Sequence, residues 1–222
     1  MRIYTAADIH GRRKRLALVT RMVEELGPDC VVAAGDLCAR FGRDPAAVLA
    51  SLDRLGVPVL VVRGNSDPRD LAGLTAGARN VIALGGRSKE VCGGRFAGLD
   101  GTVPLPFSNR AAWREKAALH AVSGLLSPQT ALVAHCPPQG AGDRVAGRFS
   151  SGSRGLARLL AAKSPALLLC GHVHEDPGVW PLGDTLVVNC ALGPRCAGAL
   201  VDWNPPAPPS ARILPGPGAG PD

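Results

Sequence analysis

Short motifs containing Asp, His or Asn each follow an apolar run directly. They are Asp8-Ile9-His10-Gly11, Gly35-Asp36-Leu37, Gly64-Asn65-Ser66-Asp67, His135 and Gly171-His172-Val173-His174. Carboxylate, imidazole and amide ligands together suit divalent transition ions such as Mn, Fe or Zn, whereas a thiolate-rich zinc site is not indicated. Two such ions about 3.5–4 Å apart can hold a phosphoryl group and lower the pKa of a water between them. The motifs therefore predict a site for two divalent metal ions.

The apolar runs before these motifs have the character of buried strands, at residues 2–7, 30–34, 58–62, 130–134 and 167–170. Apolar residues at helical spacing predict a helix over 13–26, and Asp44-Pro45 predicts the start of a second helix that Asp44 caps. Continuous Val and Leu runs separated by helices favour a parallel sheet covered on both faces. Sites in open α/β sheets form at the carboxyl ends of the strands. Five strands would therefore bring their polar residues to one edge.

The separations between motifs agree with this arrangement. Asp36 follows Asp8 by 28 residues, and Asn65 follows Asp36 by 29, which is about one βαβ unit in each case. Glycines at 11, 35, 64 and 171 allow the backbone to turn sharply beside each ligand. Taken singly, Gly-Asp-Leu and Gly-Asn-Ser are also common turn sequences. Their joint occurrence with four histidines favours the metal site, and His120, in a helical segment, is left outside it.

Length and composition favour one α/β domain over residues 1–203, followed by a Pro/Gly-rich C-terminal tail over 204–222 that is expected to lack regular structure. No apolar run approaches the ~20 residues that cross a bilayer, and the first residues enter a strand pattern without a signal-peptide core. Seven cysteines without a CxxC pair favour reduced thiols over a disulfide framework. We therefore expect a cytoplasmic protein with no membrane partner.

The formal net charge of +7 raises the question of a nucleic-acid partner. The dense basic run, residues 12–15, has no interleaved aromatic residues for base stacking and has the composition of a solvated helix face. A cluster of positive charge around a site for an anionic substrate explains the surplus as well. Nucleic acid thus stays an open partner that the sequence does not favour.

The ordered motifs resemble those of the calcineurin-like metallophosphoesterase superfamily over residues 3 to about 202. His135-Cys136-Pro137-Pro138 and the later run Val187-Val188-Asn189 are similar to the Icc-related branch of predicted phosphoesterases. The resemblance implies a four-layer α-β-β-α sandwich with two metals at the carboxyl edge of its sheets. It also implies a ligand set with Asp8, His10 and His174 on the first metal, Asn65, His135 and His172 on the second, and Asp36 bridging both. A hydroxide between the ions would attack phosphorus.

Two positions depart from the family pattern. Many members have His after the motif Asn, where it protonates the leaving group, and this chain has Ser66. Either esters with good leaving groups are favoured, or Asp67 or a metal-bound water supplies the proton. The candidate catalytic residues are accordingly Asp36, Asn65, Asp67 and His135. Cys38 replaces a carboxylate or small polar residue, and Cys38 and Cys136 are either oxidation-sensitive thiols near the metals or inert packing residues.

The leading functional hypothesis is a metal-dependent hydrolase of a small phosphomonoester or phosphodiester. One alternative is a phosphoesterase-fold scaffold or protein-interaction module with little catalysis, although scaffolds usually lose ligands and all seven positions here carry competent residues. Another is a nuclease or nucleic-acid-associated phosphodiesterase, which needs a basic groove or an added domain. Neither GxxxxGK[ST] nor GxGxxG follows the first strand, which disfavours the common nucleotide-binding folds. Substrate, native metal and oligomeric state are not specified by these motifs.

Overall fold

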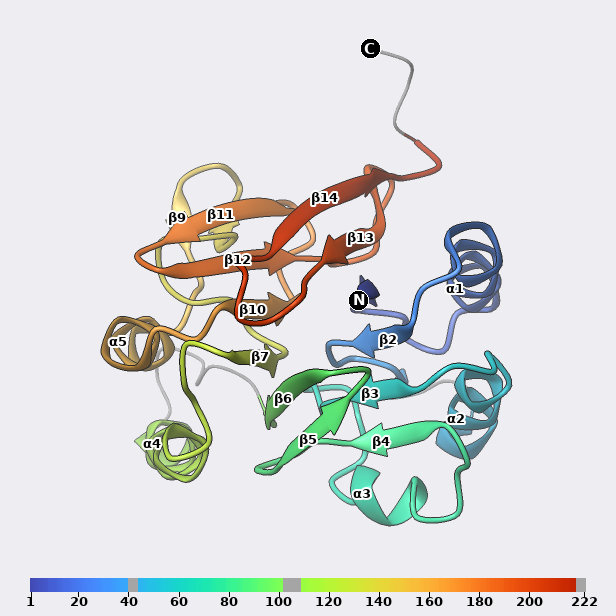
Figure 1. Ribbon diagram of the computed structural model, residues 1–222, viewed down its shortest axis with the longest axis horizontal. Coiled ribbons are helices and arrows are strands. Elements are labelled where there is room, and N and C mark those ends of the chain that lie inside the picture. The colour runs from blue at the N-terminus through green and yellow to red at the C-terminus, as the bar shows by residue number, and fades with distance from the viewer. Residues whose placement is uncertain (40–43, 102–108, 219–222) are drawn as a thin grey trace.

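The computed structural model describes residues 1–39, 44–101 and 109–218 (Figure 1). Two six-stranded sheets form its centre. In spatial order, the first sheet contains β14 (Ser210–Pro215), β13 (Cys196–Asp202), β1 (Arg2–Ala6), β2 (Cys30–Ala33), β3 (Val59–Val61) and β4 (Val81–Ala83). The second sheet contains β11 (Gly178–Leu182), β12 (Thr185–Asn189), β10 (Leu167–Cys170), β7 (Thr130–Ala134), β6 (Gly94–Leu99) and β5 (Ser88–Val91).

Helices cover the outer faces of both sheets, on opposite sides of the molecule (Figure 1). The helices beside the first sheet are α1 (Arg13–Leu26), α2 (Pro45–Asp53) and the short α3 (Leu71–Leu74). Those beside the second sheet are α4 (Asn109–Ser123) and α5 (Arg154–Lys163), and a small hairpin of β8 (Arg144–Val145) and β9 (Phe149–Ser150) follows β7 in the chain. The predicted four-layer α-β-β-α sandwich is confirmed. Among the described residues, no helix is both long and apolar enough to span a bilayer.

Three apolar layers hold the sandwich together. Because side chains alternate along a strand, Ile3 and Val32 enter the layer between the sheets, while Tyr4 and Val31 pack toward the helices. Phe96 and other residues of the second sheet fill the opposite side of the inner layer. Strands buried on both faces must be apolar at successive positions, which explains the continuous Val and Leu runs.

The first two helices agree with the sequence prediction. α1 occupies the predicted residues and ends at Gly27, whose left-handed conformation (φ +55°) is the usual helix C-cap. At the start of α2, the Asp44 side chain accepts a hydrogen bond of 3.1 Å from the backbone N–H of Ala46, and Pro45 occupies the first turn. The predicted helix over 13–26 and the predicted cap are confirmed.

Parallel pairing brings the carboxyl ends of the site strands together. β1, β2, β3 and β4 are mutually parallel neighbours, and so are β6, β7, β10 and β12. β13 lies antiparallel to β1 on its other side, with Thr5 opposite Ala199, so β1 sits between strands from the two ends of the chain. All five motif-bearing strands therefore end at the same edge of the sandwich.

The expectation of a tail without regular structure from residue 204 onward is wrong for residues 210–215. These residues form β14, which pairs antiparallel with β13 and places Ile213 opposite Ala199. Leu214 is only 5% exposed and packs in the layer under α1. Among the described strands, β14 is hydrogen-bonded only to β13, and an edge strand tolerates the proline at its end. The surrounding prolines dominate the composition of this segment, so its short apolar run did not lead to a strand prediction.

Candidate metal centre

The loops after β1, β2 and β10 place their site residues in a rarely populated backbone conformation. Asp8, His10, Asp36 and His172 have φ values of +61°, +52°, +51° and +71°. Such residues cost free energy and persist only where the surroundings fix them. Here the loops hold one another, because the His10 N–H donates to the Asp36 carbonyl (2.8 Å) and the Asp8 N–H to that of Gly35 (3.0 Å). Three of the predicted ligands, Asp8, His10 and Asp36, are thus held by backbone hydrogen bonds between the loops after β1 and β2.

Two of the motif glycines are required by space. A Cβ on Gly64 would lie 2.2 Å from Oδ1 of Asp36, and one on Gly171 would lie 2.2 Å from Cβ of Ala7 and 2.8 Å from Oδ2 of Asp8. Neither glycine has a positive φ. Any side chain at these positions would therefore displace a carboxylate of the site, so the carboxylates approach the neighbouring backbone closely.

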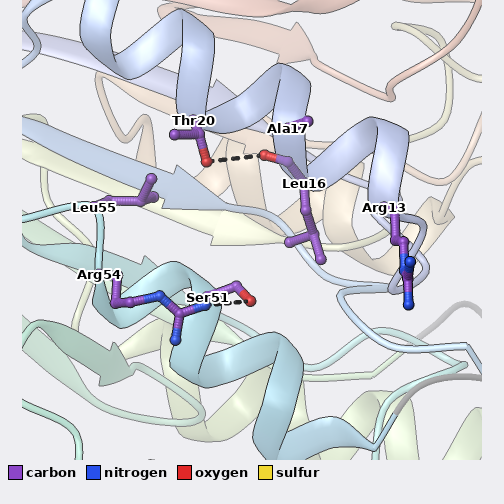
Figure 2. Close-up of a pocket in the computed structure, with 7 residues that line it drawn as sticks. All are labelled: Arg13, Leu16, Ala17, Thr20, Ser51, Arg54 and Leu55. Atoms are coloured by element: carbon purple, nitrogen blue, oxygen red, sulfur yellow. Dashed lines mark hydrogen bonds between the residues drawn. The ribbon is translucent and has the colours of Figure 1, made fainter.

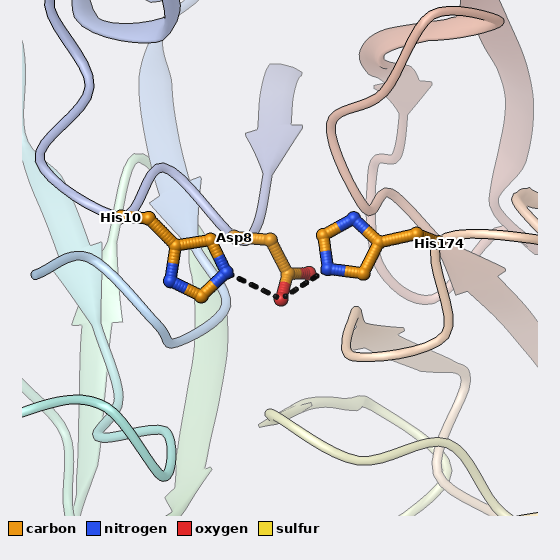
Figure 3. A group of neighbouring side chains, drawn as sticks. All are labelled: Asp8, His10 and His174. Atoms are coloured by element: carbon orange, nitrogen blue, oxygen red, sulfur yellow. Dashed lines mark ion pairs between the residues drawn. The ribbon is translucent and has the colours of Figure 1, made fainter. Parts of the chain in front are cut away.

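Asp8, His10 and His174 form the first group of ligand atoms (Figure 3), and one atom from each lies within 4.8 Å of the others. The Nε2 atoms of His10 and His174 are 3.7 and 3.2 Å from Oδ1 of Asp8. The two imidazoles are stacked, with ring centroids 6.0 Å apart. Loops from the two different sheets thus point two imidazoles at one carboxylate oxygen.

Asp8, Asp36 and His135 form a second group with the same mutual spacing, so Asp8 belongs to both groups. Asp36 has a histidine on each side: Nε2 of His10 lies 3.8 Å from its Oδ2, and Nε2 of His135 lies 3.5 Å from its Oδ1. A carboxylate in this position has one oxygen directed toward each group. This is the arrangement expected of a residue that bridges two cations.

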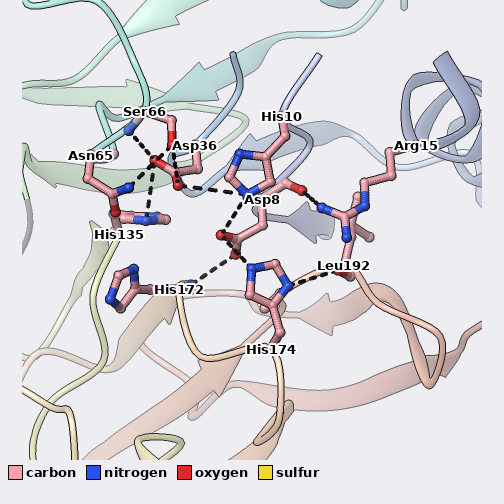
Figure 4. A network of polar contacts seen from close by, with 12 residues as sticks. Asp8, His10, Arg15, Asp36, Asn65, Ser66, His135, His172, His174 and Leu192 are labelled. Carbon is pink, nitrogen blue, oxygen red and sulfur yellow. Dashed lines mark hydrogen bonds and ion pairs between the residues drawn. The ribbon is translucent and has the colours of Figure 1, made fainter. Parts of the chain in front are cut away.

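Asn65 and His172 complete the cluster next to His135 (Figure 4). The rings of His172 and His135 are 5.0 Å apart and nearly perpendicular. Asn65 is exposed, and its Nδ2 donates to Oγ of Ser66 over 3.2 Å. In Figure 4, Asn65, His135 and His172 lie on one side of the Asp8 and Asp36 carboxylates, and His10 and His174 lie on the other. The structure therefore brings all seven predicted ligand residues together.

The site is electrostatically suited to cations. Burial opposes ionisation of Asp8 and Asp36, but contacts with His174 and with His135, respectively, outweigh it and lower the pKa of each carboxyl. The contact with Asp8 raises the pKa of His174, and for His135 the two carboxylates outweigh burial and raise the pKa. Burial lowers the pKa of His172. The carboxylates thus stay ionised. Their negative charge, which attracts protons to the neighbouring histidines, would attract a metal ion in the same way.

The contacts of the imidazole nitrogens indicate whether these histidines are suited to bind a metal ion. Nδ1 of His135 lies 2.9 Å from the Ala34 carbonyl and therefore carries a proton, so that in the neutral imidazole Nε2 has the electron pair that a metal ion can bind. That buried Nε2 has no hydrogen-bond partner among the described residues, and a lost partner costs about 1–3 kcal/mol. Nδ1 of His174 lies 3.2 Å from the Leu192 carbonyl in the same way. Metal-binding histidines typically donate their second nitrogen to such a group, so this ligand set fits metal ions.

Asp67, a candidate proton donor, lies outside both groups of ligand atoms. Its Oδ1 accepts from the backbone N–H of Cys38 (2.8 Å) and its Oδ2 from that of Gly64 (2.9 Å), while burial raises its pKa. Asp67 therefore joins the loops after β2 and β3. Cys38 is fully buried, and burial raises the pKa of its thiol to about 12, which favours the packing interpretation.

Two residues that the sequence did not single out for the site also support these loops. Asn189 at the end of β12 is fully buried, and its Nδ2 lies 2.8–3.0 Å from the carbonyls of Gly142, Val173 and Asp176. Asp100 follows β6, and its Oδ1 accepts from the N–H of Arg63 over 2.8 Å, beside the Gly64 loop. The position of Asp100 could have been recognised from the sequence as the other motifs were, because it is a polar residue directly after a strand.

A separate groove of about 430 Å³ lies between α1 and α2 (Figure 2). It is lined by Arg13, Leu16, Ala17, Thr20, Ser51, Arg54 and Leu55. This lining includes no carboxylate and no imidazole, so the groove is distinct from the metal centre.

Fold and ligand set together define a metal-binding α/β sandwich. The chain belongs to the calcineurin-like phosphoesterase family, whose model matches residues 1–176. The uncharacterized protein MJ1162 of Methanocaldococcus jannaschii is 23% identical over 198 residues, which cover 85% of this chain and 87% of that protein. Two solved structures share the fold. TT1561 of Thermus thermophilus is 21% identical, with a TM-score of 0.67 over 86% of this chain and 88% of that one. A dimetal phosphatase from Danio rerio is 14% identical, with a TM-score of 0.65 over 90% and 92%.

Proposed function

We propose that the protein is a dinuclear metallophosphoesterase that hydrolyses phosphomonoesters or phosphodiesters. The observation that carries the proposal is the position of the two carboxylates. Asp8 belongs to both groups of ligand atoms, and Asp36 lies between His10 and His135. Two cations could therefore share the carboxylates of one small cluster. Membership of a phosphoesterase family supports a phosphate ester as the substrate.

In this proposal, each side chain of the cluster has a defined role. Asp8, His10 and His174 would hold one ion, Asn65, His135 and His172 would hold the other, and Asp36 would contribute to both. Two divalent transition ions, with Mn, Fe and Zn as the candidates, would supply a Lewis acid for the phosphoryl oxygen and lower the pKa of water. The carbonyls of Ala34 and Leu192 fix the rings of His135 and His174, so that the Nε2 atoms face the carboxylates.

The two side chains after Asn65 are already engaged in contacts. The Ser66 hydroxyl donates to Oδ2 of Asp36 (2.9 Å), and both oxygens of Asp67 accept backbone N–H groups. We therefore infer that neither residue protonates the departing oxygen. Esters whose leaving group departs readily as an anion, such as aryl phosphates, are the favoured substrates.

The α1–α2 groove favours a second candidate function, a nucleic-acid-associated phosphodiesterase. Arg13 and Arg54 line this groove, and neither forms an ion pair within the ranges that the structure describes. Arg13 is the first residue of α1, which follows the loop that carries His10 directly in the chain. A strong dependence of oligonucleotide hydrolysis on salt, absent for a small aryl ester, would favour this candidate.

The test of the proposed function combines metal analysis with an assay. Purified protein loaded with Mn²⁺ should contain two ions per chain and should hydrolyse p-nitrophenyl phosphate or bis-p-nitrophenyl phosphate. Activity should disappear with a chelator and return with Mn²⁺. Two bound ions without hydrolysis of any ester in the panel would instead favour the scaffold hypothesis. Failure to bind any transition metal would refute the dinuclear site.

A further inference from the structure

Ser66 contacts both oxygens of the Asp36 carboxylate. Its backbone N–H donates to Oδ1 over 2.8 Å, and its hydroxyl donates to Oδ2 over 2.9 Å (Figure 4). Ser66 follows β3 and Asp36 follows β2, so these bonds join two neighbouring loops. One residue thereby fixes the tilt of the carboxylate as well as its position.

The same hydroxyl orients a second predicted ligand. Oγ of Ser66 accepts a hydrogen bond of 3.2 Å from Nδ2 of Asn65 while it donates to Asp36. This contact turns the NH₂ group of Asn65 toward Ser66 and leaves the amide oxygen, which is the atom that binds metal ions, on the opposite side. A hydroxyl has one proton and can both donate and accept, so it suits this position between an amide and a carboxylate.

We propose that Ser66 is a positioning residue that sets Asp36 and Asn65 for the bridging and second metal positions. The inference rests on the proposed function and extends it. A carboxylate oxygen can accept more than one partner, so the bonds from Ser66 leave electron pairs on both oxygens of Asp36 for two cations. Ser66 thus occupies the position from which many relatives supply a protonating histidine, and its single proton is used within the ligand set. Because this proton is not available to the leaving group, the proposed substrates are esters that need little protonation from the protein.

Metal affinity is the direct test. Mn²⁺ titration calorimetry should compare the wild type with Ser66→Ala, Ser66→Thr and Ser66→Val. Removing a partner of a metal ligand typically costs about 10–100-fold in affinity. We expect that loss in the Ala and Val variants, while Thr, which keeps a hydroxyl, should stay within a few-fold of the wild type. Thr and Val have nearly the same shape, so a difference between them reports the hydroxyl alone.

Two controls separate this role from general stability. The melting temperature of the metal-free variants should change little relative to Ser123→Ala. Ser123 is a matched control on α4, where its hydroxyl donates to the His120 carbonyl. A wild type that binds no Mn²⁺ would refute the proposed function itself. If the wild type binds two ions and the Val variant binds them as tightly as the Thr variant, the role of Ser66 is wrong while the proposed function stands.

Discussion

The backbone N–H of His172 donates a hydrogen bond of 2.9 Å to Oδ2 of Asp8. Asp8 follows β1 in the first sheet and His172 follows β10 in the second, so the bond crosses the sandwich at its carboxyl edge. The other oxygen, Oδ1, faces the imidazoles of His10 and His174. Asp8 thus uses one oxygen to join the sheets, and its other oxygen faces the two candidate metal-binding histidines. Contact between the two sheets and the geometry of the candidate metal centre therefore depend on the same side chain.

Replacing the proposed bridge tests the site most directly. Asp36→Asn keeps the size of the side chain but removes the negative charge between the two groups, so both ions should bind more weakly and hydrolysis should fall by several orders of magnitude. Metal content by elemental analysis and kcat/KM for an aryl phosphate measure the two effects. Asp184→Asn, far along the chain on an exposed residue, is the control. Near-normal metal content and activity in the Asp36 variant would contradict the assignment.

Metal binding should stabilise the fold, because ligands from both sheets share the ions. A ligand at about 100 times its Kd contributes about 2.7 kcal/mol, which corresponds to a rise of roughly 5–10 °C in melting temperature for a chain of this size. Thermal denaturation with excess Mn²⁺ and with a chelator measures this shift. It should shrink in His174→Ala, which lacks one ligand of the first group. An equal rise in the melting temperature of that variant would indicate that Mn²⁺ binds at another site.

Activity should depend strongly on the leaving group. General-acid catalysis is typically worth about 10²–10⁴-fold, and the hydroxyl of Ser66 is bound to Asp36. Aryl phosphates should therefore be hydrolysed much faster than alkyl phosphates. Ser66→His should narrow the gap by raising the relative alkyl rate, measured at saturating Mn²⁺ because the same change removes the hydroxyl. Equal rates for both ester types in the wild type would show that another group supplies the proton.

We expect the Asn189 side chain to hold the loop that carries His172 and His174 in its conformation. Asn189→Asp removes the NH₂ group and brings a negative charge toward three carbonyl oxygens. We expect a loss of a few kcal/mol in the free energy of unfolding. Weaker metal binding should accompany it, measured by denaturation and by Mn²⁺ titration. Asn80→Asp, at a partly buried amide whose Nδ2 donates to the Asp53 carbonyl, controls for loss of a side-chain amide elsewhere. An Asn189 variant as stable as this control would remove the basis for the prediction.

Cutting the chain after Trp203 should destabilise the protein, in contrast to the expectation from composition. The cut removes β14, exposes one edge of β13 and uncovers the layer that Leu214 fills. Burying one Leu is worth about 1.5–3 kcal/mol, so the melting temperature should fall by several degrees. A chain that ends at Gly218 keeps β14 and should melt like the full protein. Equal melting of the two shortened chains would argue that β14 contributes nothing.

The metal centre was more predictable than the chain terminus, and the reason is physical. Asp8, Asp36 and His135 each follow a strand buried on both faces, so an apolar run marks their position. β14 lacks such a run, because an edge strand with one neighbour can alternate Arg212 with Ile213. Asn189 was noticed only through family resemblance, since its three carbonyl partners lie in two loops distant in sequence. Contacts of that kind become visible only once the chain is folded.

The position of β1 between β2 and β13 affects how the chain folds during its synthesis. β1 precedes the other described strands in the sequence, yet Arg2 of this strand pairs with Asp202 of β13. At about 5–20 residues per second, ribosomes need roughly 10–40 s to reach that partner. During this interval one side of β1 has unpaired backbone groups and exposed apolar side chains, which favour aggregation. The Asp8 loop can therefore reach its final conformation only after β13 has been synthesised and has paired with β1. Chaperones that bind extended apolar segments would protect the growing chain until then.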